Sequence, residues 1–415
     1  MGVVGVRSDH DTRRAAGAAA ALRTTTAVRE RAQYLLNRAR AGDSRWFSVH
    51  DASLPAAAAE VADVTRARYP DLRIPYHSRW RHFEAGGVDR KAELDTRLAA
   101  ADTPARARAM IDLAVVSVLL DAGAGPDWHY LEATTGQLFS RSEGLGVASW
   151  HAFCGGVFSS DPAHPLQVDA AGLRNLSVER LAGAFQCTPA NPLVGLDGRV
   201  LVLRRLGDAL ASQPEVFGPQ RRPGGLFELS DANRVDAHHI LSQLLTSLAG
   251  IWLAPNSIGA EALGDCWHHD AVPGPGLTRG WVPFHKLSQW LTYSLLEPFE
   301  WAGVHVEGLD ALTGLPEYRN GGLLLDTGVL GLREPARAGR TWEVSDELVV
   351  EWRALTVALL DELAPLVRGR LGVDAGQMPL ACVLEGGSWA AGRALAERLR
   401  DGRPPLSVVS DGTVF

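Results

Sequence analysis

The chain has 415 residues, of which 48 are acidic and 41 basic, so its formal net charge is −7. This acidic balance argues against a nucleic-acid-binding protein, which normally carries a basic excess, and no apolar run approaches the ~20 residues of a membrane-spanning helix. Only Lys91 and Lys286 are lysines, so 39 of the 41 basic residues are arginines. A lysine kept in such a chain can mark a position that arginine cannot fill.

The N-terminal segment 1–25 combines charged residues with a short alanine tract and lacks the apolar core of a signal peptide, so we expect a mobile arm there. Residues 26–415 are expected to form a single helix-rich unit, and a division into two closely packed lobes is left open. The four cysteines lie far apart without a CxxC motif, which argues against a disulfide framework and favours a cytoplasmic protein. They are Cys154, Cys187, Cys266 and Cys382.

Apolar residues recur at helical spacing through most of the chain. The pattern predicts a helix capped by Thr26 and further helices over 56–68, 106–120, 235–253, 284–301, 346–370 and 389–400. Two short alternating segments, 128–132 and 137–141, flank a turn and predict a hairpin, and 406–415 predicts a small ribbon. The βαβ alternation of a parallel sheet is missing, so we expect a mainly α fold with a few short strands.

Common cofactor and nucleophile motifs are missing. Neither lysine follows the glycine spacing of a P-loop, and there is no GxGxxG between a strand and a helix and no GxSxG. Cys266, His268 and His269 could contribute to a metal site, but a hydrogen-bonded loop is the favoured alternative. We therefore expect neither a cofactor nor a metal.

The first polar cluster lies in residues 75–87, which end in Gly-Gly. It places His77, Arg79 and Arg81 around aromatic residues that include Trp80. Arginines presented with imidazoles and planar rings suit a phosphate or a sugar. An ion-paired structural loop is the alternative.

The second cluster follows a predicted core helix. The glycine-rich turn over 120–129 carries Asp127 and Trp128, and Glu143 lies a short distance further along the chain. Helix capping accounts for one aspartate of this turn, but the combination favours the wall of a binding site.

The third cluster begins a predicted helix. Helical spacing puts Lys286, Gln289 and Trp290 on neighbouring rows of an apolar, aromatic helix, so the ammonium is expected to face an enclosed polar partner. Snorkelling of the lysine to the surface is the alternative.

The fourth cluster lies between two apolar stretches and contains Glu317, Arg319 and Asn320. A carboxylate held by such neighbours can act as a base or stabilise a developing cation. A buried salt bridge with no chemical role is the alternative.

Long segments of the chain resemble a family of bacterial and fungal uracil-catabolism proteins that has been carried as a domain of unknown function. The resemblance runs from about residue 26 to the C-terminus. It includes IPYHSRWRHFEAGG, LLDAGAGPDW, FSRSEGL, NPLVGLDGR, PFHKLSQWLTYSLLEP, LTGLPEYRNGGLLLDTGVL, ELVVEWRALTVALLDELAP and LACVLEGGSWAAGR. It implies action on ribosylurea or its phosphate, downstream of a cyclohydrolase-II-like partner enzyme that opens the uracil ring.

A looser similarity connects the chain with the queuosine-nucleotide salvage hydrolases, which are N-glycosidases with a fold akin to that of helix-rich DNA glycosylases. This similarity places their active lysine at Lys286 and their catalytic carboxylate at Glu317, where those enzymes have Asp. The sequence Asn320-Gly321-Gly322 departs from their Val-Pro-Gln, which implies a different recognition of the base. It implies hydrolysis of an N-glycosidic bond through an oxocarbenium-like transition state.

In this hypothesis Glu317 orients water, Lys286 holds a sugar hydroxyl or phosphate oxygen, and Arg79 and Arg81 complete an anion site. The urea leaving group is hydrogen-bonded by Asp127 or Glu143.

Two other functions are left open: metal-assisted hydrolysis of the urea amide bond, and binding of nucleotide fragments without turnover as a partner of the cyclohydrolase. The phosphorylation of the substrate and the oligomeric state are also open, whereas membrane and nucleic-acid partners have no support in the sequence.

Overall fold

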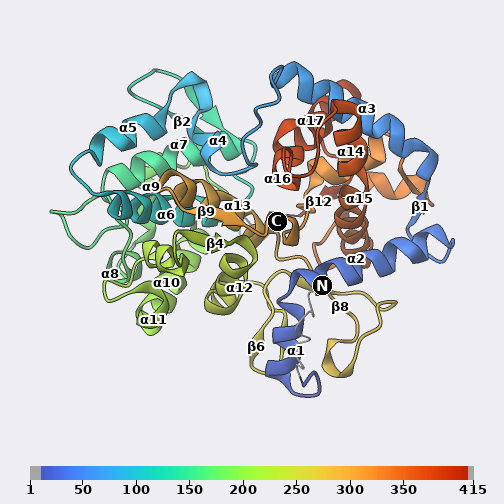
Figure 1. Ribbon diagram of the computed structural model, residues 1–415, viewed down its shortest axis with the longest axis horizontal. Helices are drawn as coiled ribbons and strands as arrows, with labels where there is room; N and C mark the ends of the chain where they lie inside the picture. The colour runs from blue at the N-terminus through green and yellow to red at the C-terminus, as the bar shows by residue number, and fades with distance from the viewer. Residues whose placement is uncertain (1–10, 410–415) are drawn as a thin grey trace.

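The computed structural model describes residues 11–409 and shows a mainly α protein (Figure 1). Among these residues there are seventeen α-helices and only short strands, which confirms the predicted fold class. The apolar stripes seen in the sequence are buried. In α2 (Thr25–Arg40), for example, the buried face includes Val28, Ala32 and Leu35.

One group of helices surrounds α6 (Thr103–Leu119), whose residues are nearly all buried from Ala107 onward. This group lies on the left of Figure 1, and α13 packs against α6 at its inner side. Its other members are α4 (Trp80–Phe83), α5 (Arg90–Arg97), α7 (Arg141–Cys154), α8 (Ala170–Arg174), α9 (Val178–Ala184), α10 (Leu196–Ser212), α11 (Pro214–Phe217), α12 (Ala237–Ser247) and α13 (Lys286–Trp301).

A second group surrounds the long helix α15 (Glu347–Leu371) and lies on the right of Figure 1. This group contains α2, which lies near the N-terminus, together with the last helices of the chain. The other members are α3 (Leu54–Arg68), α14 (Tyr318–Asp326), α16 (Leu380–Val383), the π-helical turn η8 (Leu384–Ser388) and α17 (Trp389–Arg400).

The strands form two-stranded pairs within the described residues. The predicted hairpin is present as β2 (His129–Leu131) and β3 (Leu138–Ser140). The other antiparallel pairs are β1 (Phe47–Val49) with β10 (Leu330–Leu332), β5 (Ser257–Ile258) with β6 (Glu261–Ala262), and β7 (Cys266–His268) with β8 (Trp281–Pro283). Two pairs are parallel: β4 (Arg234–Asp236) with β9 (His305–Glu307), and β11 (Thr341–Trp342) with β12 (Ser407–Val408).

The expected C-terminal ribbon is present only in part. Ser407 and Val408 pair in parallel with β11, far back in the sequence, rather than with a neighbouring strand. Asp411 and Gly412, the expected turn of that ribbon, lie outside the described residues.

Part of the segment expected to be a mobile arm is a packed helix. Residues Ala15–Leu22 form α1, in which Ala18, Ala19 and Leu22 are buried. They pack with Ile258 and Cys266 in a small separate apolar cluster, and α1 lies beside the segments that carry β6 and β8 in Figure 1.

Two helix boundaries differ from the expected ones for reasons of capping. Thr24 rather than Thr26 caps α2, since its side chain accepts a hydrogen bond from the backbone of Ala27. Likewise Asp236 caps α12, so the segment just before it is free to pair as β4.

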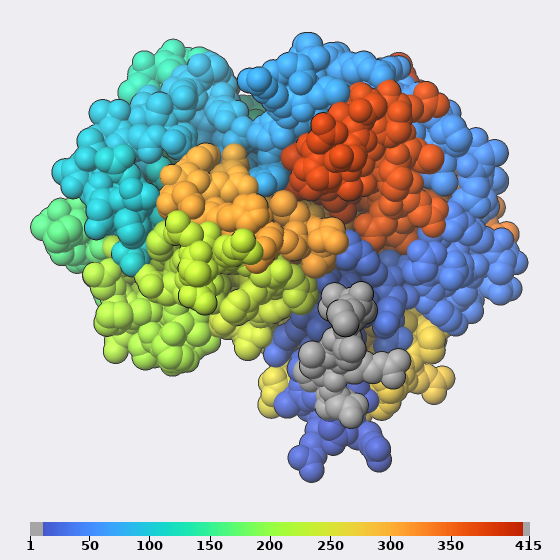
Figure 2. All heavy atoms as spheres, viewed as in Figure 1, coloured from blue at the N-terminus to red at the C-terminus, as the bar shows by residue number. Residues whose placement is uncertain are grey.

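The main apolar core runs through both groups of helices without a break. In Figure 2 the two groups appear as two rounded masses with a notch between them at the top of the view. Among residues 11–409, no helix is both long and apolar enough to cross a membrane.

Candidate functional site

The start of α13 is fixed by the buried carboxylate of Asp265. This residue precedes β7, and the β7–β8 hairpin brings it beside the first turn of the helix. Its carboxylate forms two ion-paired contacts of 2.7 and 2.8 Å with Arg353 and accepts hydrogen bonds from Trp267 Nε1 at 2.8 Å and from the backbone N–H of Lys286 at 2.9 Å. Burial alone would raise the pKa of the Asp265 carboxyl, but Arg353 and these donors hold it well below its usual range. Asp265 is therefore a permanent anion that anchors the helix.

Lys286 is the first residue of α13 and is half-buried. Burial lowers the pKa of its ammonium, and the charge of Arg353 lowers it further. Three carboxylates act in the opposite direction, namely Asp265, Glu317 and Asp121. Lys286 thus lies among charged neighbours of both signs.

Glu317 caps the N-terminus of α14. Its two carboxylate oxygens accept backbone hydrogen bonds from Arg319 at 2.7 Å and Asn320 at 2.6 Å. Burial raises the pKa of the Glu317 carboxyl, against the opposing effects of these two N–H groups and of the charges of Lys286 and His77. Each carboxylate oxygen therefore uses a lone pair to bind the first turn of the helix.

One arginine links the two predicted active groups. While the Arg353 guanidinium holds Asp265, its Nε donates to the carbonyl of Pro316 at 3.2 Å, directly before Glu317. The same side chain therefore sets the positions of Lys286, through Asp265, and of Glu317.

The side of the site around Arg79, which we call the first wall, contains buried polar nitrogens without a hydrogen-bond partner among the described residues. Arg79 is fully buried; it donates to Ser117 at 2.6 Å and to Asp121 at 2.8 Å, yet its Nη2 has no hydrogen-bond partner among the described residues. The same is true of Trp290 Nε1 and His82 Nδ1. Arg79 lies over the Trp290 ring at 5.6 Å, and the rings of His82 and Trp290 meet edge to face at 5.7 Å, so these atoms share one region.

Unpaired buried donors are costly, by about 1–3 kcal/mol each, so their gathering at one place indicates a ligand site. Burial and the charge of Arg79 lower the pKa of the neighbouring His82 to about 4, which leaves that imidazole neutral at physiological pH.

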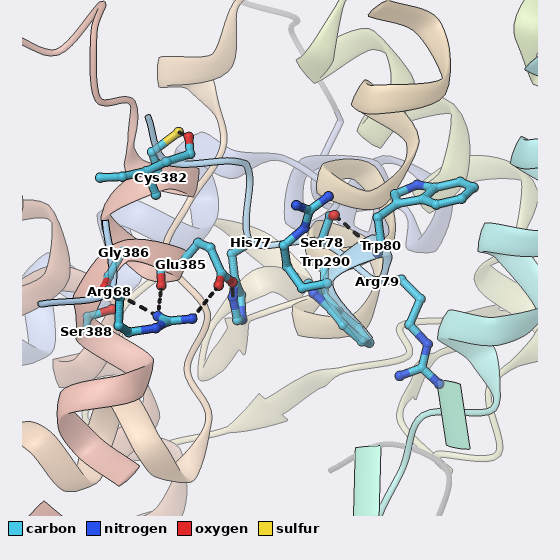
Figure 3. A network of polar contacts seen from close by, with 12 residues as sticks. Arg68, His77, Ser78, Arg79, Trp80, Trp290, Cys382, Glu385, Gly386 and Ser388 are labelled. Carbon is cyan, nitrogen blue, oxygen red and sulfur yellow. Dashed lines mark hydrogen bonds and ion pairs between the residues drawn. The ribbon is translucent and has the colours of Figure 1, made fainter. Parts of the chain in front are cut away.

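The opposite wall comes from the second group of helices. His77 contacts Glu385 of η8 through Nδ1 at 2.8 Å, and Arg68 contacts the other carboxylate oxygen at 2.8 Å (Figure 3). Burial would raise the pKa of the Glu385 carboxyl, but His77 and Arg68 together lower it to about 2. We refer to the region bounded by Lys286, Glu317, Arg79 and His77 as the central site.

Four of the predicted binding residues lie elsewhere. Trp80 is buried in the core, where its Nε1 donates to the carbonyl of Ser294. Arg81 points to Glu297 at 2.7 Å rather than into the central site. Trp128 is a core residue whose Nε1 donates to the carbonyl of Phe185, and Asp127 beside it is exposed on the turn. Side chains alternate in direction within such short segments, so neighbours in sequence diverge.

The remaining predicted residues support or border the central site. Gln289 is fully buried; its Oε1 accepts from the backbone of Thr313 at 3.3 Å and its Nε2 has no partner in the described part of the chain. Asn320 fixes α14 by accepting from Ser388 at 2.8 Å. Arg319 extends away to the carbonyl of Gly402. Glu143, at the start of α7, pairs with Arg393 of α17 at 3.1 Å.

The candidate metal residues point in different directions. His269 contacts Glu351 at 3.0 Å, whereas His268 is exposed beside Asp270. Over residues 11–409, no three or more His, Cys, Asp or Glu side chains are arranged to hold a metal ion.

Several residues of the site were not among the predicted ones: Asp121, Asp265, His82, Arg353 and Glu385. The repeated combination of acid, aromatic and glycine over 351–353 and 384–389 is the signal that could have indicated two of them. His82 belongs to the first polar cluster, 75–87, but Asp265 carries no such signal, because it acts through a partner that is distant in sequence.

The fold and this geometry define a helix-rich protein with a cluster of buried charged and polar side chains where its two groups of helices meet. The chain belongs to the family described as "Protein of unknown function (DUF1688)", whose family model matches residues 21–415. It is 40% identical over 398 residues to Protein urg3 of Schizosaccharomyces pombe, which covers 94% of this chain and 96% of that protein. It is 39% identical over 377 residues to Uracil catabolism protein 4 of Lachancea kluyveri, which covers 82% of this chain and 85% of that protein.

Proposed function

We propose that this protein acts in uracil catabolism and hydrolyses the N-glycosidic bond of ribosylurea or its 5′-phosphate, releasing urea. The name of one relative, Uracil catabolism protein 4, supports a role in uracil catabolism. The observation that supports the reaction is the placement of Glu317 and Lys286 by one side chain: Arg353 binds the carboxylate of Asp265, which anchors Lys286, and the carbonyl of Pro316, directly before Glu317.

The chemistry follows from the way Glu317 is held. Cleavage of an N-glycoside passes through a cation at the anomeric carbon, which a fixed carboxylate stabilises more effectively than water does, because it needs no reorganisation. The two backbone N–H groups set the orientation of Glu317 before the substrate arrives. The same carboxylate can accept a proton from the water that attacks the sugar.

The donors of the first wall suit the rest of the substrate. Arg79 Nη2, Trp290 Nε1 and Gln289 Nε2 can donate to sugar hydroxyls or phosphate oxygens. The Lys286 ammonium adds a positive charge on the same face of α13 as Trp290, one turn away. Arg79 takes the anion-binding role alone, since Arg81 is paired with Glu297.

The test is to incubate the purified protein with ribosylurea and with its 5′-phosphate and to measure urea and free sugar. We expect Glu317→Gln to lower the rate of urea release by about 10²–10⁴-fold, the usual contribution of a positioned general base. Asp236→Asn is the matched control, because Asp236 also caps a helix with its carboxylate but lies on the exposed start of α12.

The products separate this proposal from the other functions. Ammonia and a carbamate in place of urea would indicate hydrolysis of the amide bond. Tight binding of the substrate without turnover would indicate a non-catalytic role, and either result would overturn the proposal.

A further inference from the structure

The carboxylate of Glu385 is held by three side chains. Its Oε1 accepts from Arg68 at 2.8 Å and from the hydroxyl of Tyr69 at 3.1 Å, and its Oε2 contacts His77 Nδ1 at 2.8 Å. Figure 3 shows Arg68 and His77 on either side of this carboxylate. With burial opposed by these partners, Glu385 stays ionised throughout the neutral range.

This arrangement depends on a close approach of two helices. A Cβ added at Gly387 of η8 would lie 2.4 Å from both Thr65 Oγ1 and the carbonyl of Val61 in α3. Only glycine allows η8 to lie so near α3, whose end then delivers Arg68 and Tyr69 to Glu385. Single π-helical turns of this kind are frequent at functional sites.

The imidazole of His77 is consequently fixed in orientation. Its backbone N–H donates to the carbonyl of Ala381 at 3.0 Å, and its Nδ1 faces Glu385, so Nε2 lies at the opposite edge of the ring. The side chain is 12% exposed. No hydrogen bond to Nε2 is present within residues 11–409. A carboxylate that binds Nδ1 in this way fixes the orientation of the ring and places a hydrogen at Nδ1.

Hydrogen bonds between η8 and α14 fix the positions of His77 and Glu317 relative to each other. Ser388 of η8 donates to Asn320 at 2.8 Å, and Asn320 in turn donates its backbone N–H to Glu317. Because Glu385 of η8 also contacts His77, the positions of the two residues relative to each other are fixed by hydrogen bonds of η8 and α14.

We infer that His77 is the acid that protonates the urea leaving group and that Glu385 is the residue that positions it. This assignment rests on the proposed glycosidase activity. Urea leaves poorly as an anion, so its nitrogen needs a proton as the bond to the anomeric carbon breaks.

The step balances as follows. Nε2–H of the imidazolium gives its proton to the urea nitrogen, which keeps the electron pair of the broken C–N bond. Water then adds to the anomeric carbon and gives a proton to Glu317. Transfer of that proton back to Nε2 through solvent restores both groups, and the net reaction consumes one water.

Other acidic side chains near the central site form ion pairs with arginines. Asp121 is paired with Arg79 at 2.8 Å and Glu143 with Arg393 at 3.1 Å. His82 is neutral, with its pKa lowered to about 4 by burial and by Arg79. His77 thus remains the side chain with a fixed orientation and an open nitrogen.

The first experiment compares two leaving groups. Nitrophenolate departs from a p-nitrophenyl riboside without protonation, whereas urea does not. We expect His77→Asn to lower kcat/KM for ribosylurea by about 10²–10⁴-fold and to lower that for the nitrophenyl riboside by less than about tenfold. Because both substrates are measured on one preparation, a loss of folded protein cancels in the ratio.

The matched control is His151→Asn. His151 contacts Glu132 at 2.7 Å, and Glu132 is paired with Arg90, so this is a second His–Glu–Arg network, formed by α5, α7 and β2 outside the central site. This variant should leave the ratio of the two substrates unchanged.

Glu385→Ala tests positioning with the same pair of substrates. Loss of the carboxylate removes the hydrogen-bond partner that fixes the His77 ring through Nδ1. We therefore expect kcat/KM to fall more for ribosylurea than for the nitrophenyl riboside, as in His77→Asn.

The outcomes are distinct. An equal loss of kcat/KM for both substrates in His77→Asn would overturn the assignment of His77 as the acid, and an equal loss in Glu385→Ala would overturn the positioning role of Glu385. Both results would leave the glycosidase activity intact. A wild-type protein that releases no urea from either form of ribosylurea would overturn the proposed function and the inference with it.

Discussion

The two lysines of this chain occupy opposite kinds of environment. Lys91 of α5 forms an ion pair with Asp95 at 2.6 Å and lies over the ring of Trp301 at 4.7 Å, contacts that an arginine could also make. Lys286 instead begins a buried helix among four charged neighbours. A compact ammonium fits there, whereas a planar guanidinium needs a wider space.

We predict that Lys286→Arg folds normally and loses activity by about 10²-fold, the cost of displacing a bound group by roughly 1 Å. Lys91→Arg is the control and should retain full activity. Steady-state kinetics of urea release and circular dichroism of both variants provide the measurement. Wild-type kinetics in Lys286→Arg would show that any cation serves at this position.

At the scale of elements, the ends of helices rather than their middles build the central site. Lys286 begins α13, Glu317 caps α14, and Glu143 lies in the first turn of α7. Helix N-termini carry partial positive charge, so a carboxylate such as Asp265 or Glu317 is stabilised there. The resulting site is rich in groups that attract anions and hydroxyls while holding two carboxylates of its own.

The contact between η8 and α3 gives a prediction about stability. We expect Gly387→Ala to lower the free energy of unfolding by about 1–3 kcal/mol, because the added Cβ would overlap the backbone of Val61. Gly369→Ala, in α15, is the comparison. A Cβ there meets nothing within 4 Å, so this change should stabilise the protein by about 0.4–1 kcal/mol.

Thermal or urea unfolding of the two variants measures the difference. If Gly387→Ala were as stable as Gly369→Ala, then η8 would be able to withdraw from α3 at no cost, and the fixed position of Glu385 would lose its structural basis.

At the scale of the whole molecule, the central site lies where the two groups of helices meet. Glu143 of α7 and Arg393 of α17 form an ion pair between them, and both side chains are about 40% exposed. Such a pair contributes less than about 1 kcal/mol to stability. Because this ion pair lies where the two groups of helices meet, we expect it to hold the groups together around a ligand rather than to stabilise the fold.

We predict that Glu143→Arg raises KM for ribosylurea with little change in the melting temperature, because two arginines would then repel each other across the gap. The double variant Glu143→Arg/Arg393→Glu should restore KM. If Glu143 instead contacts the urea group, as the sequence suggests, the double variant would stay impaired. The KM values of the three proteins distinguish these roles.

The fold was predictable from the sequence to a large extent, because helical spacing of apolar residues reports directly on burial. Lys286 and Glu317 could be singled out because they interrupt apolar patterns, whereas the short helix α14 that Glu317 caps was not predicted. Trp80 and Trp128 were not, since an aromatic ring in a polar segment suits a core as well as a binding wall. Asp265 could not have been found, because its role exists only once the β7–β8 hairpin has folded.

The packing of α1 has a practical consequence for the start of α13 and the central site. His285, directly before Lys286, has a left-handed backbone with φ of 51°, and its Nε2 contacts the carbonyl of Leu22 at 3.0 Å. The last carbonyl of the N-terminal helix thereby helps to hold the residue that precedes the key lysine. Trimming the chain past Leu22 for expression or crystallisation would thus remove a support of the site, 263 positions away in sequence.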